Sequence, residues 1–452
     1  MLVMQPRRPI LADTRRDVAH LVRRVAFGAP ASRIDELAAL GFEGAVEALC
    51  DLERPDEAAA AVAPPVFDTA RFLAARDGTE AERQAAERVA AEERRALPLW
   101  WVRRMVAADN PVREKLTFLW HDHFATSIEK VKIAQLMHIQ HQTLYDLGPG
   151  RFDLLVSAVA RDPAMLVWLD GRESRAGAPN ENFARELFEL FTLGHWSAGH
   201  DRHGGAQPYT EADVADAARA LTGWVIDPAT GTGRLVANRH DRGTKTVLGT
   251  TGALGLDEVV AAATSHPACA PHVVARLWSR VGRPASPDDP VVQELAEPFA
   301  SDLDVAALLR RMLLHPAFLE PATRGALVRS PVDHVVGLAR ALDVMPDERV
   351  VPVLAALGQL PFLPPDVSGW PANEAWLSTA SALLRLQVAS VVATMANVAE
   401  LDAADRADRP ELLARLLNVD RWGAATTAAL RGADDPRTAL TLALVAPEHL
   451  VA

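Results

Sequence analysis

Helix start and stop signals recur along the whole chain, and they limit its fold more than any other feature. Thr14 to Asp17 forms a capping-box pattern, Asn110-Pro111 combines a cap with a first-turn proline, and Ser330-Pro331-Val332-Asp333 combines both signals. Strand signals are few, and the best is Gly233 to Gly249, where two short extended runs flank a turn at Arg242-Gly243. The pattern predicts a mainly α, multi-helical globular protein with one minor β-hairpin at about residues 233–249.

Composition narrows the class of protein. The 452 residues are 49% hydrophobic, which is enough for a sizeable core and excludes wholesale disorder. The net charge of −12 argues against a nucleic-acid binder and against docking on an anionic membrane. The cysteines, Cys50 and Cys269, lie far apart in sequence, so a disulfide framework is excluded and we expect two small buried thiols.

Targeting and domain signals are sparse. The first residues, MLVMQPRRPILADTRRD, lack the apolar core of a signal peptide, and no later stretch is long and apolar enough to span a bilayer. We therefore expect a cytoplasmic protein. We also expect one large helical domain over residues 1–395, with a helical extension over residues 396–452 packed on it. Residues 78–96 are densely charged, which is typical of a solvated helix or a lid-like insertion.

The segment Asn180 to Gly194, NENFARELFELFTLG, is a well-capped helix in pattern, with charged and apolar residues on opposite sides. Glu181, Arg185 and Glu189 share one face, and Glu186 lies beside them. Glu186 and Glu189, three residues apart, can present two carboxylates to one metal ion. The alternative interpretation is an exposed face held by Arg-Glu ion pairs.

Two further segments carry residues that are common in active sites. His121-Asp122-His123 can supply two metal ligands if the segment is extended, whereas on a helix the imidazoles lie about 200° apart and cannot face one ion. His240-Asp241, followed by Lys245, can bind a phosphate or sulfate or move protons. Structural histidines and an ordinary polar turn are the alternatives.

Several segments together resemble a bacterial family known as domain of unknown function 1800 (DUF1800). The matching segments follow the family's order and are HLVRRVAFGA, REKLTFLWHDHFATS, NENFARELFELFTLG, YTEADVADAARALTGW, HDRGTKTVLG, SPVDHVVGLARAL and LGQLPFLPPDVSGWPANEAWL. The resemblance implies a mostly helical fold but no established catalytic residues. It also implies an exported protein encoded beside an alkaline-phosphatase-like partner, although this sequence shows no export signal.

We interpret the chain as an enzyme with a polar site of unknown substrate that can employ a divalent metal ion. In this interpretation the three polar segments meet around one site. The metal ligands are His121, His123, Glu186 and Glu189, and the catalytic residues are His240, Asp241, Arg185 and Lys245. The alternative function is a non-catalytic binding partner or maturation factor for a protein encoded nearby.

Overall fold

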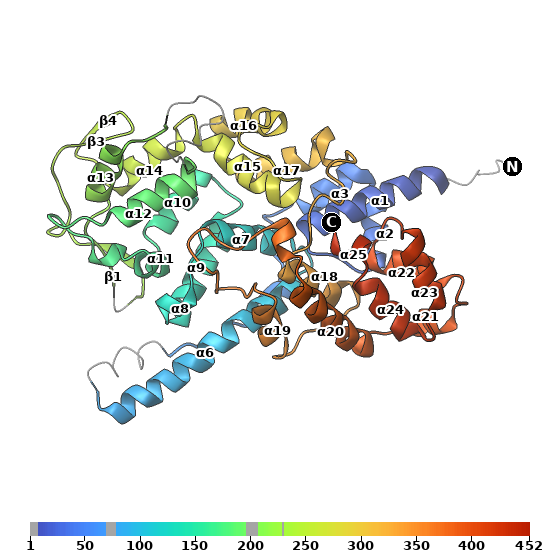
Figure 1. Cartoon of the computed structure of the whole chain (residues 1–452). Helices are drawn as coiled ribbons and strands as arrows, with labels where there is room; N and C mark the ends of the chain where they lie inside the picture. The colour runs from blue at the N-terminus through green and yellow to red at the C-terminus, as the bar shows by residue number, and fades with distance from the viewer. Residues whose placement is uncertain (1–7, 69–77, 196–206, 228–229) are drawn as a thin grey trace.

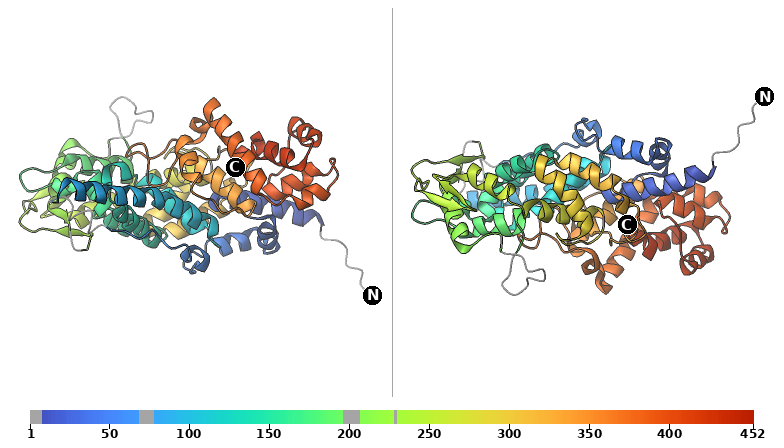
Figure 2. Two further views of the ribbon diagram at one scale, coloured as in Figure 1. Left: turned by 90° about the horizontal axis from the view of Figure 1, so that it is seen from below. Right: turned by 90° about the horizontal axis from the view of Figure 1, so that it is seen from above.

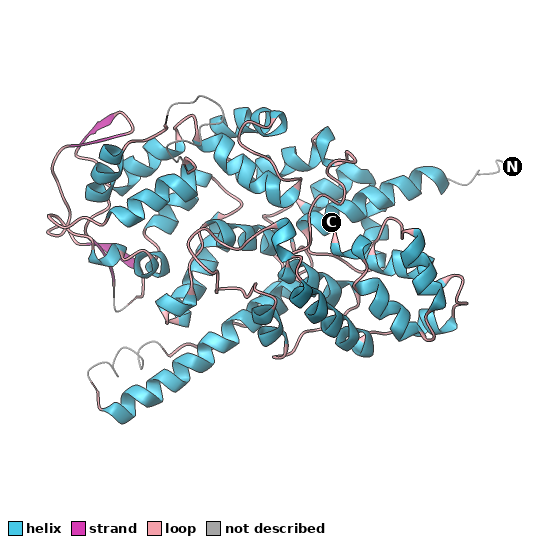
Figure 3. Cartoon of the chain, in the orientation of Figure 1, coloured by secondary structure: helices cyan, strands magenta, loops and turns pink. Residues whose placement is uncertain are grey.

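The computed structural model describes residues 8–68, 78–195, 207–227 and 230–452, and its regular structure is mainly helical (Figure 3). The predicted mainly α fold is confirmed. Within the ranges described, no helix is long and apolar enough to cross a membrane.

The amino-terminal helices lie at one end of the elongated molecule, beside the carboxyl-terminal helices (Figures 1 and 2). They are α1 (Arg8–Val25), α2 (Ala31–Ala39), α3 (Gly41–Leu49) and α4 (Glu57–Ala60). The predicted capping box at Thr14 to Asp17 lies inside α1, because the helix already begins beside Pro9, a residue that suits the first turn.

Helix α6 (Glu80–Ala107) has two halves of opposite character. Thr79 caps it with a complete capping box, in which Glu82 is the reciprocal partner. The first half projects from the body of the molecule and is mostly exposed (Figure 1). The second half carries Trp100 and Trp101 into the core. The densely charged segment is therefore the outer part of one long helix.

The middle part of the chain, residues 112–314, is a packed set of short helices. It contains α7 (Val112–His123), α8 (Ile128–Val131), α9 (Ala134–Leu147), α10 (Phe152–Ala160), α11 (Pro163–Trp168), α12 (Glu181–Glu186), the π-helix η3 (Leu187–Thr192), α13 (Glu211–Ala220), α14 (Leu256–Thr264), α15 (Cys269–Val281), α16 (Pro290–Asp302) and α17 (Val305–Leu314). Short 3₁₀ turns cover Gly171–Glu173, Pro316–Phe318 and Asn373–Trp376.

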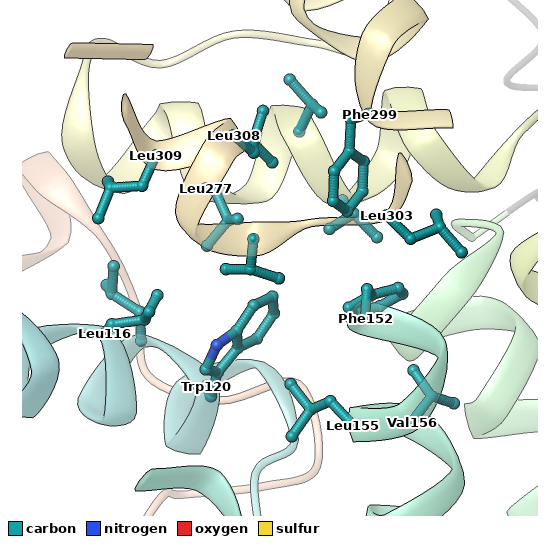
Figure 4. Packing of buried hydrophobic residues seen from close by; sticks show 14 of the residues in the cluster. Leu116, Trp120, Phe152, Leu155, Val156, Leu277, Phe299, Leu303, Leu308 and Leu309 are labelled. Carbon is teal, nitrogen blue, oxygen red and sulfur yellow. The ribbon is translucent and has the colours of Figure 1, made fainter. Parts of the chain in front are cut away.

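The main core lies where α7, α10, α15, α16 and α17 meet (Figure 4). Trp120 of α7 is fully buried and packs against Phe152 of α10, with a ring-centroid distance of 5.7 Å. Its indole nitrogen donates a 2.9 Å hydrogen bond to the Gly148 carbonyl, so the one polar atom of the side chain is satisfied. Leu277 of α15 and Phe299 of α16 belong to the same cluster (Figure 4).

The strands differ from the predicted single hairpin. β1 (Trp224–Ile226) pairs with β2 (Gly233–Leu235), and β3 (Lys245–Val247) pairs with β4 (Thr250–Gly252), both antiparallel. The predicted turn at Arg242-Gly243 is therefore wrong. Leu248 and Gly249 make the β3–β4 turn, with φ of 49° and 81°, because a two-residue hairpin turn of this kind needs positive φ at both positions.

The carboxyl-terminal region has a core of its own that also holds residues of α18. The helices from residue 331 to the end of the described chain are α18 (Pro331–Ala341), α19 (Val350–Ala356), α20 (Thr379–Met395), α21 (Ala399–Ala403), α22 (Arg409–Leu417), α23 (Ala424–Gly432), α24 (Pro436–Leu444) and α25 (Pro447–Leu450). Leu338 of α18 packs in one cluster with Leu413 and Leu440. The amide of Asn418 also donates a 2.9 Å bond to the Ala29 carbonyl. The predicted boundary at residue 395 stays a prediction.

Candidate functional site

The segment from Asn180 to Gly194 forms α12 and then a π-helix. Asn180 caps it by accepting a bond from the Asn182 backbone, and Gly194 follows the helix with a φ of 93°. Leu187 and Phe191 are each 1% exposed, so the apolar face is buried as the pattern predicts. The change to π geometry at Leu187 was not predicted. Such distortions of the helix occur frequently at functional sites.

The charged face of this segment is organised by ion pairs around Arg185. The guanidinium makes two bonds of 2.9 and 2.7 Å to Glu211 of α13, and it lies 3.6 Å from Glu189 and 4.0 Å from Glu181. The hydrogen bond from Arg185 lowers the pKa of Glu211. Glu189 also contacts His195 at 3.1 Å. This arrangement is the ion-paired face that the sequence left as the alternative.

His121 lies inside α7 and is enclosed by aromatic rings. It is 1% exposed, and its Nε2 accepts a 3.0 Å bond from the Phe362 backbone N–H. The rings of Trp101, Phe362 and Trp370 surround it, each with its centroid 5.4 Å from that of the imidazole. Burial lowers the pKa of His121 to about 3, so the imidazole is neutral.

His123 points to a different part of the core and meets a second histidine that the sequence interpretation missed. Its Nε2 lies 3.0 Å from the Phe191 carbonyl, and His272 of α15 lies 2.9 Å from the adjacent Leu190 carbonyl. The two rings are 6.3 Å apart. Burial lowers the pKa of His123 well below its usual range and that of His272 to about 4. Both imidazoles therefore pack against the π-helix as neutral groups.

Glu186 ends α12, and Glu189 lies in the π-helix whose carbonyls contact His123 and His272. Burial, and then repulsion from Glu189, raises the pKa of Glu186. In the part of the chain that the structure describes, no three His, Cys, Asp or Glu side chains are grouped to hold a metal ion. The metal-binding roles of His121, His123, Glu186 and Glu189 stay a prediction.

The third predicted segment, His240 to Lys245, forms a turn held by α13 and its carboxyl end. His240 Nδ1 lies 3.0 Å from the Thr222 carbonyl, and Arg219 binds the Asp241 carboxylate at 2.9 Å. Lys245 is 1% exposed and donates to the Asp241 and Gly243 carbonyls at 2.6 and 3.0 Å. The side chains of this turn are therefore engaged with one another and with α13.

A cavity of about 300 Å³ opens elsewhere, between α1, α7, α15 and the start of α18. A smaller chamber of about 50 Å³ adjoins it, because both are lined by Lys115, Arg280, Ser330, Asp333 and Trp376. We call the two together the basic cavity, since five of its lining residues are cationic: Arg23, Arg24, Lys115, Arg280 and Arg329. The predicted site residues are absent from its lining. Its rim reaches solvent at Pro284, Ala372 and Glu374.

Several buried donors without partners lie in the lining of this cavity. Among the described residues that line it, the buried side-chain atoms lacking a hydrogen bond are Arg23 Nε, Arg24 Nε and Nη1, Arg329 Nε and Trp370 Nε1. All of them are N–H donors. Arg24 and Arg329 are 2% and 5% exposed. Buried polar groups in native proteins are normally paired, and an exception calls for an explanation such as a bound ion or ligand.

The charges of the cavity are only partly compensated. Lys115 pairs with Asp333, Arg280 pairs with Asp122 at 2.5 Å, and Arg23 lies 3.5 Å from Asp420. Arg24 and Arg329 form no ion pair with any described carboxylate. Burial, and then repulsion from Arg23, lowers the pKa of each of these two groups to about 9, so both stay charged at neutral pH.

Four of the segments that carry the family resemblance supply this lining, including LGQLPFLPPDVSGWPANEAWL, which contains Gln359 and Trp376. HLVRRVAFGA contains Arg23 and Arg24, REKLTFLWHDHFATS contains Lys115, and SPVDHVVGLARAL contains Asp333. Two adjacent arginines inside the otherwise apolar run of α1 were the available signal. A charged pair within a core-forming helix needs compensation from elsewhere in the fold.

The fold and the cavity define a mainly helical protein that encloses a basic, donor-rich site. The chain belongs to the DUF1800 family, described as protein of unknown function, whose family model matches residues 20–451. No curated protein and no solved structure matches the chain.

Proposed function

We propose that this DUF1800 protein binds an anionic small molecule in the basic cavity. The observation that carries the proposal is the set of buried N–H donors without partners, above all on Arg24 and Arg329. A buried charge that keeps unused donors costs stability, and a ligand with negatively charged oxygens would offset that cost. The volume of about 300 Å³ lies at the lower end of the range for small-molecule pockets.

The test compares anions at matched ionic strength. Inorganic phosphate should raise the unfolding temperature of the parent protein above its value in chloride, because a ligand that binds the folded state stabilises it. Arg24→Met should abolish this difference. Arg349→Met is the matched control, because Arg349 is an exposed arginine that pairs with Asp347 and lies outside the cavity lining. A parent protein with the same unfolding temperature in every anion would contradict the proposal.

The metal-assisted enzyme is a second candidate, supported by the His123–His272 pair beside the π-helix. The imidazole Nδ1 of His123 is buried without a partner. Glu186 is the last residue of α12, and Glu189 lies in the π-helix that follows it. Histidines beside helical carboxylates are a common ligand set for di-metal sites. Elemental analysis of the purified parent and of a His123→Ala variant tests this function. Equal metal content in the two proteins would exclude His123 as a ligand.

The partner-binding function is supported by the outer surface of α20. Arg385 is the only charged residue of this helix and is 2% exposed, whereas Leu383, Val391 and Met395 are exposed. An apolar groove of about 330 Å³ runs beside them against α18 and α19. The partner expected from the family resemblance is the alkaline-phosphatase-like protein encoded nearby. Val391→Asp should reduce co-purification of that protein, whereas Leu235→Asp, on a distant exposed leucine, should not.

A further inference from the structure

We propose that the ligand of the basic cavity presents a doubly charged phosphate group of the monoester type. This inference rests on the proposed anion-binding function and names the chemical class of the ligand. It is carried by the number of uncompensated charges, by their place in the lining of one cavity, and by the number of free donors.

The number of uncompensated charges is two. Lys115, Arg280 and Arg23 each have a carboxylate partner, as described above. The exposed carboxylate of Glu374 lies at the rim. Arg24 and Arg329 are left without an ion pair among the described residues. A singly charged anion would neutralise only one of them, whereas a dianion would neutralise both.

Both arginines line one cavity of about 300 Å³, together with Asp333. Asp333 itself is already engaged with Lys115 and with the hydroxyl of Ser330. Two charges enclosed in one cavity favour a compact dianion, whose charges lie on one group, over an extended dicarboxylate.

The free donors also match a phosphate. Two free positions belong to Arg24, and one each belongs to Arg23, Arg329 and Trp370. Charged N–H donors form strong hydrogen bonds to phosphate oxygens, and a monoester offers three such oxygens.

The amino end of α18 does not account for the site, because its donors are in use. The Val332 N–H donates to the Gln359 side chain at 2.9 Å, and the Asp333 N–H donates to Ser330 Oγ at 3.2 Å. Pro331, the first residue of the helix, has no N–H. The side chains of Arg24 and Arg329 are therefore the groups that bind the phosphate.

The experiment uses three probes by calorimetric titration of the intact protein at a pH above the second ionisation of phosphate, about 6. Methyl phosphate is then a dianion, dimethyl phosphate is a monoanion of similar shape, and succinate is an extended dianion. Methyl phosphate should bind about tenfold more tightly than either of the others, a ratio that one extra ion pair can supply. Arg24→Met and Arg329→Met should each abolish the tighter binding of methyl phosphate, and Arg349→Met should preserve it.

The possible results separate the two proposals. Equal binding of methyl and dimethyl phosphate, or tighter binding of succinate, would overturn this inference and leave anion binding in place. Failure of all three probes to bind would overturn the proposed function itself.

Ala452 also lines the cavity, so a chain lengthened after Ala452 is a further control. If only the lengthened chain bound methyl phosphate, the terminal carboxylate would be the anion that the arginines hold, and the inference would fall.

Discussion

Two buried cations, Lys245 in the turn after α13 and Arg24 in the basic cavity, differ in how their donors are used. Both side chains are almost inaccessible, at 1% and 2% exposure. Lys245 donates to two backbone carbonyls and lies 3.9 Å from the Asp241 carboxylate. Arg24 donates to the Thr323 carbonyl, but its Nε and one Nη have no partner. A buried cation with filled donors supports the fold, whereas Arg24 combines empty donors with a place in the lining of a cavity, where a ligand can reach them.

The comparison also shows why the family resemblance alone did not locate the site. Lys245 lies in HDRGTKTVLG and Arg24 lies in HLVRRVAFGA, and both segments match the family. The first was predicted as a site because, besides matching the family, it places a histidine, an aspartate and a lysine within six residues. The partners that distinguish the two cations are visible only in three dimensions.

The largest effect is expected from Lys245→Met. This change removes the buried donor that two backbone carbonyls of the turn share, so the free energy of unfolding should fall by about 3 kcal/mol. Urea denaturation measures the change. Phosphate should still raise the stability of the variant as it does that of the parent. A loss below about 1 kcal/mol would show that the lysine does not support the turn.

Arg24→Met should have the opposite effect: it should keep the stability of the protein without anion and remove the response to phosphate. Without added anion its free energy of unfolding should stay within about 1 kcal/mol of the parent or rise, because replacing an uncompensated buried charge by an apolar side chain is often stabilising. With phosphate at about 100 times its dissociation constant, the parent should gain about 2.7 kcal/mol and the variant nothing. A variant that gains as much as the parent would place the anion elsewhere.

His121 provides a test of the neutral histidines in the core. Its pKa of about 3 in the folded state lies below the unfolded value of about 6.5. Between these values the unfolded chain binds a proton that the folded chain does not, so stability falls as the pH decreases. Between about pH 7 and about pH 5.5 the parent should lose about 1 kcal/mol through this group.

The comparison for this prediction is His121→Gln, which keeps an acceptor for the Phe362 N–H. The variant should show a correspondingly smaller loss of stability over the same pH range. Urea denaturation at the two pH values measures both proteins. An unchanged pH dependence in the variant would mean that His121 is not the neutral buried group described here.

The smallest effect is expected from Glu189→Gln. Glu189 contacts Arg185 at 3.6 Å and His195 at 3.1 Å, and Arg185 keeps its paired bonds to Glu211 in the variant. Stability should therefore change by no more than about 0.5 kcal/mol. The response to phosphate should not change. A drop in bound metal with the fold intact would instead favour the metal-assisted enzyme.

The sequence predicted the local features of the candidate region well and its chemistry poorly. The caps at Asn180 and Ser330 are both present. Each depends on hydrogen bonds within about four residues, which a sequence displays directly. The pairing of the strands was missed, because the choice between Arg242-Gly243 and Leu248-Gly249 as the turn depends on which extended runs meet.

By itself, the sequence determined a mainly helical fold, the positions of several helix starts and membership of the DUF1800 family. The tertiary structure decided which charged residues meet. Arg24 and Arg329 belong to segments that lie far apart in sequence, and nothing near either residue in the chain shows that its donors remain free. The physical reason is that helix signals act through neighbouring backbone groups, whereas charge compensation depends on every group within reach in space.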